Sequence, residues 1–340
     1  MASASGNIRF DRSRGTSQRC GNPLAEFSKA DGSASMPSAF LFLNDELMEG
    51  LRRCGFADAM TGEADFLFSH ASYEHMQPYL AIIKQKPARD APRVQDAHRL
   101  MLFDREVKSV LFKYIGVFET KMRAQYAGIM SHEHGSFCVY DSSNFLRPKH
   151  HEASLRRYRS EAERKRLKGS PQIARAMDSA DGRCPIELGV ECITLGTLSE
   201  LYANTKDNTA TAAVAASFGT PKSILSNWLK VVCAARNAMA HFEPFVGRAQ
   251  LAAIPRGIKG LSANQRAPFY VSFLLLSLLS TDHPFADDSL SYAATLACEL
   301  DAVLAKWEPS FGYLYHELGV PGDWRAAMCE AAQSGNLFEQ

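Results

Sequence analysis

The chain has 340 residues, with 38 Lys and Arg against 37 Asp and Glu, so its net charge is +1. Hydrophobic residues make up 46% and charged residues 22%, which excludes an intrinsically disordered chain and a uniformly basic nucleic-acid binder. The eight cysteines are scattered singly with no Cys-x-x-Cys pair, which indicates reduced thiols rather than a disulfide framework or a zinc knuckle. The longest apolar run, Phe269–Leu279, is shorter than the ~20 residues that span a bilayer. We therefore expect a cytoplasmic protein that has no membrane partner.

The pattern of the first third of the sequence predicts an extension followed by short helices. Residues 1–36 have no apolar periodicity and no secretory leader, and we expect a flexible N-terminal extension there. Apolar residues then recur at helical spacing over 38–55 and 72–84. These segments predict an N-terminal helical subdomain at 37–91, after which prolines interrupt the chain.

A second domain is predicted over 92–335, beginning with the longest periodic segment of the sequence. Apolar residues from Leu100 to Tyr126 follow the i, i+3, i+4 pattern, and a helix over 94–130 would be ~55 Å long. A helix of this length is typical of the spine of a bundle. The sequence has no run of alternating Val, Ile and Thr, so the expected fold is all-α.

The remainder of this domain contains a basic insertion at about 145–170 and further helices. Nine basic and three acidic residues between Arg147 and Lys168 give a local charge of +6, which is typical of a surface helix or a mobile insertion. Further helices are expected over 186–201, over 209–218 and from Pro221 to Phe242, with Thr220 as the N-cap of the last. The C-terminal helices are predicted at about 266–332.

One short string near the end of an apolar helix combines residues suited to phosphate chemistry. It runs from Arg236 and Asn237 to His241. Arginine can hold a phosphate with two N–H donors, and histidine can move a proton near neutral pH. On RNA these two groups could promote attack of the 2′-hydroxyl on its own phosphate without a metal ion or other cofactor. No second ligand lies at i, i+4 from His241, which disfavours a metal site. The alternative is a histidine that caps the carbonyl end of a helix.

Five segments in order along the chain resemble the Abi-like (abortive infection) family of the all-helical HEPN superfamily. The segment around His241 resembles the helix that bears the Arg-Asn-x-x-x-His signature of that family. The five segments are Ser72–Leu80, Leu102–Ala127, Ile193–Tyr202, Ser226–His241 and Leu318–Trp324.

The resemblance implies a helical bundle of HEPN type that acts as a metal-independent endoribonuclease in defence against phage. Arg236 and His241 would be the catalytic pair, and Asn237, Glu119 and Arg123 would support them. It also implies a homodimer and a toxin-type activity restrained by a small RNA. The sequence departs from the family by placing an acid, Glu243, close to the motif.

Three alternatives remain open from the sequence. Glu119 and Arg123 could form an ordinary i, i+4 ion pair on a helix surface. The protein could bind RNA without cutting it, or it could be a scaffold that dimerises through its helices.

Given this resemblance, the basic insertion is a candidate RNA-binding element in which arginine and lysine contact phosphates and one tyrosine stacks on a base. The candidate residues are Arg156, Arg157, Tyr158, Arg159, Arg164, Lys165, Arg166 and Lys168.

Overall fold

The computed structural model describes residues 44–88, 91–248, 251, 255–257, 267–280, 282 and 290–334. Within these ranges the chain forms α-helices and short 3-10 helices but no strand, and an isolated antiparallel bridge joins Phe145 to Thr205. The prediction of an all-α fold is confirmed. The extension predicted for residues 1–36 lies outside the described residues.

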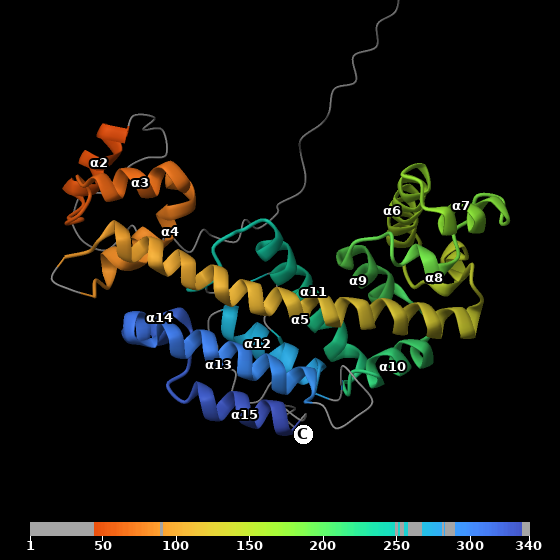
Figure 1. Ribbon diagram of the computed structural model, residues 1–340. Coiled ribbons are helices and arrows are strands. Elements are labelled where there is room, and N and C mark those ends of the chain that lie inside the picture. Colours follow the sequence, from red (N-terminus) through yellow and green to blue (C-terminus); the bar gives the residue numbers. More distant parts are fainter. Residues whose placement is uncertain are drawn as a thin grey trace, which may run out of the picture.

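The long helix α5 (Val94–His134) is the spine of the molecule (Figure 1). It contains 41 residues and is about 60 Å long at 1.5 Å per residue. Its predicted apolar positions are buried, except for the half-buried Val110. The helix ends where Gly135 takes a positive φ of 79° and its N–H bonds the carbonyl of Ser131.

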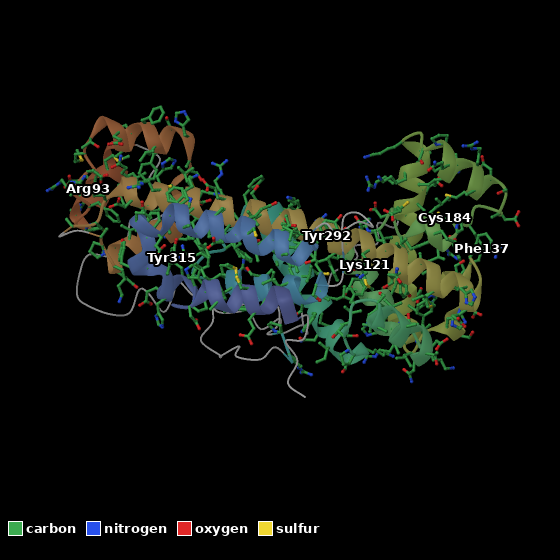
Figure 2. The ribbon with its side chains drawn as sticks, turned by 60° about the horizontal axis from the view of Figure 1, so that its bottom comes forward. Arg93, Lys121, Phe137, Cys184, Tyr292 and Tyr315 are labelled. Atoms are coloured by element: carbon green, nitrogen blue, oxygen red, sulfur yellow. The ribbon has the colours of Figure 1, made fainter. Side chains whose placement is uncertain are left out.

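Two groups of helices lie toward the two ends of this spine (Figure 1). Figure 2 shows Arg93, just before α5, and Phe137, just after it, at opposite ends of the molecule. The first group comprises α2 (Asn44–Arg53), α3 (Gly62–His70) and α4 (Tyr73–Gln85). The second group comprises α6 (Pro148–Leu167), α7 (Pro171–Asp178), α8 (Ile186–Gly189) and α9 (Leu195–Asn204), and it follows the 3-10 helices Cys138–Tyr140 and Ser142–Asn144.

The remaining helices cover another side of the spine, where α10, α11, α12 and α13 all contact α5. The bounds are α10 (Asn208–Ala216), α11 (Lys222–Ala240), α12 (Ala267–Leu278), α13 (Tyr292–Phe311), the 3-10 helix Gly312–Leu314, α14 (Tyr315–Leu318) and α15 (Trp324–Ser334). The longest apolar run of the sequence forms α12, which is buried almost all round. None of the helices in the described ranges has the length and apolarity needed to cross a membrane.

A single hydrophobic core runs from Leu47 in α2 to Met328 in α15. The helices of the segment 37–91 share this core with the rest of the chain, since α3 and α4 both contact α5. The boundaries given above for the domains stay a prediction.

Three local expectations need correction or completion. The helix expected over 186–201 is divided into α8 and α9, because the Thr194 side chain accepts the N–H of Thr197 and starts a new helix. Thr220 does not cap α11: Pro221 is the N-cap residue, and the buried Thr220 hydroxyl has no hydrogen-bond partner within the described residues. The basic insertion is a surface helix, α6, that contacts α9.

Candidate functional site

The structure brings three of the predicted site residues together on the facing sides of α5 and α11. Glu119 Oε1 accepts a hydrogen bond from Arg123 Nη2 on the next turn of α5. Glu119 Oε2 lies 3.7 Å from Arg236 Nε on α11. The side chains of Glu119 and Arg123 are only 16% and 13% exposed, so the pair is not an ordinary surface ion pair. One carboxylate therefore links two arginines from two helices.

Arg123 also fixes the segment that precedes α9. Its Nη2 donates to the carbonyl of Ile193 at 3.0 Å, and its Nη1 lies 3.5 Å from Glu191 Oε2. These contacts attach the start of α9 to the middle of α5, because Ile193 immediately precedes Thr194, the N-cap of α9. Arg123 thus holds the scaffold around Glu119.

The guanidinium of Arg236 faces Glu119 through Nε, while its Nη1 and Nη2 atoms form no hydrogen bond among the described residues. Its side chain is 35% exposed, and Nε is buried without a hydrogen-bond partner among the described residues. The contact with Glu119 is an ion pair that is too long to be a hydrogen bond. Two parallel N–H donors of an arginine match the oxygens of a phosphate, so Arg236 can take an anion at this edge of the bundle.

His241 lies at the C-terminal end of the same helix and is exposed. Its backbone N–H donates to the carbonyl of Asn237 at 3.0 Å, whereas its ring has no hydrogen-bond partner in the part of the chain that the structure describes. His241 is nevertheless the C-cap residue of α11, so the alternative interpretation, a histidine placed at the carbonyl end of a helix, stays open beside the catalytic one. The next residue, Phe242, takes a φ of +56° and reverses the chain away from the helix axis.

A buried polar cluster holds the turn that follows His241. Asp104 of α5 is completely buried and accepts the backbone N–H of Val246 at 2.7 Å and that of Phe245 at 3.2 Å. Lys108 Nζ lies 2.8 Å from Asp104 Oδ2 and donates to the carbonyl of Glu243 at 3.0 Å. We call Asp104 and Lys108 the turn clamp, because their charged groups fix the backbone just beyond His241.

The Tyr79 hydroxyl of α4 completes the surroundings of Asp104, to which it donates at 2.6 Å. No motif in the sequence points to this cluster. The available signal was the position of Asp104 and Lys108 at i, i+4 on the buried face of a helix, where charged side chains are rare unless paired.

Glu243, the acidic residue that departs from the family pattern, forms an ion pair. Glu243 Oε2 lies 2.7 Å from Arg248 Nη1, so its charge is compensated within the same turn. Its side chain is 48% exposed, and the ion pair lies on the surface beside His241. Within the described residues the negative charge nearest to Arg236 is therefore that of Glu119, whereas the charge of Glu243 is paired with Arg248.

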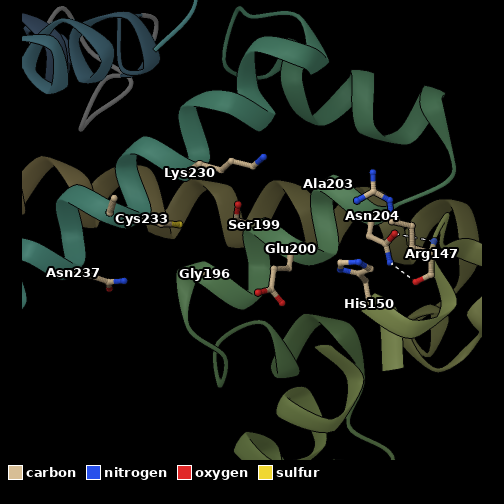
Figure 3. A pocket seen from close by; sticks show the side chains of 11 residues that line it. Arg147, His150, Gly196, Ser199, Glu200, Ala203, Asn204, Lys230, Cys233 and Asn237 are labelled. Carbon is tan, nitrogen blue, oxygen red and sulfur yellow. Dashed lines mark hydrogen bonds between the residues drawn. The ribbon is translucent and has the colours of Figure 1, made fainter. Parts of the chain in front are cut away.

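Asn237 points to a different side of α11 from Arg236 and lines a pocket of about 510 Å³ between α6, α9 and α11 (Figure 3). Cys233 lies one turn earlier on the same wall. Burial raises the pKa of the Cys233 thiol to about 12, so this thiol stays protonated at neutral pH and is not a ready nucleophile. The pocket shares Asn237 with the motif, whereas Arg236 and His241 are not among its lining residues.

Most arginines of the basic insertion already have acidic or aromatic partners on the surface. Arg156 pairs with Glu152, Arg157 with Glu200, Arg164 with Glu161, and Arg166 with Glu163 and Asp178, while Arg159 lies over the ring of Tyr140. Such exposed pairs contribute about 0–1 kcal/mol each, so a polyanion could displace the acids. RNA binding by these arginines and by Lys165 and Lys168 stays a prediction.

Stacking of Tyr158 on a base is a wrong prediction. Its side chain is fully buried, and its hydroxyl donates to the carbonyls of Cys184 at 3.0 Å and Pro185 at 2.9 Å. The ring anchors α6 to the segment before α8, and it forms an edge-on pair with Tyr140. The residue is part of the core beneath the basic surface.

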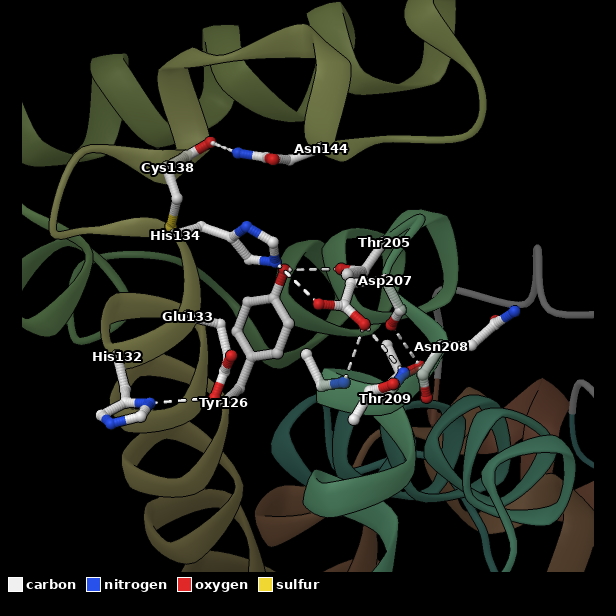
Figure 4. A network of polar contacts seen from close by, with 12 residues as sticks. Tyr126, His132, Glu133, His134, Cys138, Asn144, Thr205, Asp207, Asn208 and Thr209 are labelled. Atoms are coloured by element: carbon white, nitrogen blue, oxygen red, sulfur yellow. Dashed lines mark hydrogen bonds and ion pairs between the residues drawn. The ribbon is translucent and has the colours of Figure 1, made fainter.

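A second polar network joins the end of α5 to the start of α10 (Figure 4). Asp207 is the N-cap of α10 and accepts the N–H groups of Thr209 and Ala210, while His134 Nε2 lies 3.0 Å from its other oxygen. Its groups satisfy one another, which is the arrangement of a helix cap rather than of a reactive site. Within the described residues no group of three or more His, Cys, Asp or Glu side chains comes together as a metal site.

The fold and this site define an all-helical protein with a cationic, histidine-containing helix end on its surface. The Abi-like protein family matches residues 66–246, which is more than half of the chain and includes α4, α5 and all of α11. The chain therefore belongs to the Abi-like protein family. Membership in this family suggests a role in abortive-infection defence. No curated protein and no solved structure matches the chain.

Proposed function

We propose that this protein is a metal-independent endoribonuclease of HEPN type that acts in abortive-infection defence against phage. The observation that carries the proposal is that Glu119 positions Arg236 on the helix that ends at His241. The ring of His241 is exposed and has no hydrogen-bond partner among the residues that the structure describes. A growth-arresting nuclease needs restraint, and a small RNA as the restraining partner belongs to the same proposal.

In the proposed reaction Arg236 binds the non-bridging oxygens of the scissile phosphate and stabilises the charge that develops on them. His241 removes the proton of the adjacent 2′-hydroxyl. The 2′-oxygen then forms a bond to phosphorus while the bond from phosphorus to the 5′-oxygen breaks. The leaving 5′-oxygen takes a proton from an acid, which is a second imidazolium or water. The products are a 2′,3′-cyclic phosphate and a free 5′-hydroxyl.

A homodimer is part of this proposal and has support from the surface beside His241. Phe112 of α5 and Phe242 are 42% and 62% exposed, and both line a pocket of about 700 Å³ with Met239. Exposed aromatic side chains that cluster are typical of interfaces. A second copy that covers Phe242 would lie next to His241, and its own histidine could supply the second proton.

The test compares the wild-type protein with Arg236→Ala, Arg236→Lys and His241→Ala in an RNA cleavage assay with excess chelator. We expect the wild type to cut RNA and each variant to be slower by about 10²–10⁴-fold, as for the loss of a general acid or base. Arg236→Lys should not rescue cleavage, because lysine cannot bind a phosphate with two parallel donors. The products should carry cyclic phosphate ends.

Matched controls are Arg52→Ala on α2 and His132→Ala at the far end of α5, whose side chains are 58% and 82% exposed. Both should cut RNA at the wild-type rate. The proposal is wrong if wild-type protein leaves RNA intact under these conditions. Retained binding of intact RNA by the wild type would then identify the protein as a non-catalytic RNA binder.

A further inference from the structure

The pocket between α6, α9 and α11 has a cationic lining that the proposed reaction does not use. Three of its lining residues are basic: Arg147, His150 and Lys230. Figure 3 shows Arg147 and His150 toward one end of the pocket and Asn237 toward the other, with Lys230 on α11. The only acidic lining residue is Glu200.

The charges in this pocket are unbalanced once existing ion pairs are counted. Glu200 already accepts hydrogen bonds from Arg157 Nη1 and from Ser154 Oγ. The side chains of Arg147 and Lys230 have no acidic partner among the described residues, in which twenty ion pairs form between other side chains. The pocket is thus a place where positive charge is left without a partner.

The backbone around Arg147 is fixed, which distinguishes it from an ordinary surface arginine. Asn204 Oδ1 accepts the N–H of Arg147 at 2.9 Å, and Asn204 Nδ2 donates to the carbonyl of Arg147 at 3.1 Å. The neighbouring residue Leu146 donates its N–H to the carbonyl of Asn204 at 2.8 Å. These bonds hold the start of α6 against the end of α9, and only the Arg147 side chain remains adjustable.

Arg147 and His150 lie at the N-terminal end of α6, and this position also favours an anion in the pocket. Arg147 is the N-cap residue of a 20-residue helix that has no acidic residue in its first turn. The N-terminal end of a helix carries a partial positive charge, so basic side chains there are unfavourable unless a negative group neutralises them. A phosphate in the pocket would offset both the unpaired side chains and the helix dipole.

We propose that this pocket binds the backbone phosphate of a nucleotide next to the scissile phosphate in single-stranded RNA. The proposal rests on the function proposed above, since Asn237, which lines one end of the pocket, belongs to the same motif of α11 as Arg236 and His241. The volume of about 510 Å³ lies within the ~300–1,000 Å³ of small-ligand sites. Arg147 and Lys230 contact the phosphate, and His150 adds a further donor. The protein consequently needs RNA longer than a dinucleotide for full affinity.

The experiment measures binding of a short 2′-O-methyl oligonucleotide, which has no free 2′-hydroxyl and cannot be cut by the proposed reaction. The variant Arg147→Ala/Lys230→Ala is compared with the wild type and with Lys306→Ala/Arg325→Ala, which removes the same two kinds of charge from α13 and α15. We expect the pocket variant to bind about tenfold or more weakly, and the slope of log K against log salt to fall by about 0.7 for one lost single-strand phosphate contact. The control should match the wild type in both quantities.

Unchanged affinity and slope in the pocket variant would overturn this inference. It would also be overturned if a nucleoside monophosphate competed as well as the oligonucleotide, because the pocket would then be a free-nucleotide site. Cleavage of natural RNA gives an independent readout: the pocket variant should raise KM and leave kcat unchanged, and a fall in kcat with unchanged KM contradicts the proposal. Failure of the function proposed above appears separately, as intact RNA with the wild type in chelator.

Discussion

Removing one charge of the turn clamp should destabilise the protein strongly, whereas removing both charges should cost less than the sum. Asp104 is fully buried, the Lys108 side chain is 7% exposed, and their charged atoms are 2.8 Å apart. Taking away one partner of a buried ion pair costs about 3–5 kcal/mol, because the other charge is left without compensation. The whole free energy of unfolding of a domain is about 5–15 kcal/mol. We therefore expect Asp104→Asn and Lys108→Met each to lower it by about 3 kcal/mol or more.

The assay is urea unfolding of the wild type, both single variants and the double variant, with the m value checked for constancy. The coupling energy of the double-mutant cycle should be about 1–3 kcal/mol. The matched control is the exposed pair Glu49–Arg52 on α2, for which a much smaller coupling energy is expected because water screens its charges. A coupling energy for the clamp no larger than that of Glu49–Arg52 would refute the reasoning, as would single variants that cost less than 1 kcal/mol.

Two further variants test features away from the proposed active site. Asp207→Ala should lower the free energy of unfolding at pH 7 by about 1 kcal/mol through loss of the α10 cap. The backbone N–H of Ala210 holds the pKa of the Asp207 carboxyl below its ordinary 3.8, so this contribution is present above pH 3.8 and is lost as the pH falls through the lower folded value. Urea unfolding should thus show the variant and wild type converging in acid, and a constant difference would contradict the cap. Tyr158→Phe removes the donor to two buried carbonyls and should cost about 1–2 kcal/mol by the same measurement. It should leave RNA affinity unchanged, and weaker RNA binding by the folded variant would contradict a purely structural role.

The all-helical architecture was predictable from the sequence because the apolar residues on the buried face of each long helix recur at helical spacing. The apolar positions of α5 gave its length to within a few residues, and the apolar run Phe269–Leu279 gave α12. The helices α3 and α7 escaped prediction because, with 9 and 8 residues, they contain too few turns for the i, i+3, i+4 pattern to be recognised. The division between α8 and α9 was missed because Thr194, a single capping side chain, interrupts an otherwise continuous apolar pattern.

The sequence identified individual residues of the candidate site but not the contacts between them. The string around Arg236 identified one helix, but 117 positions separate Arg236 from Glu119, and only the packing of α11 on α5 brings them together. The turn clamp was hidden because its buried charges look like ordinary surface charges when their partners are unknown. The misplacement of Tyr158 has a different cause: the basic residues around it concealed the buried stripe of Ser154, Tyr158 and Ala162 at i, i+4 and i+8.

The turn clamp has a consequence for how the protein is made. Asp104 bonds the backbone of Val246, which lies 142 positions later in the chain. During synthesis the turn beyond His241 cannot take its final form until the ribosome has passed this point and α5 can fold back against it. A nascent chain that ends before Val246 therefore lacks the fixed turn beyond His241, and under the proposed function it would also lack the finished active site.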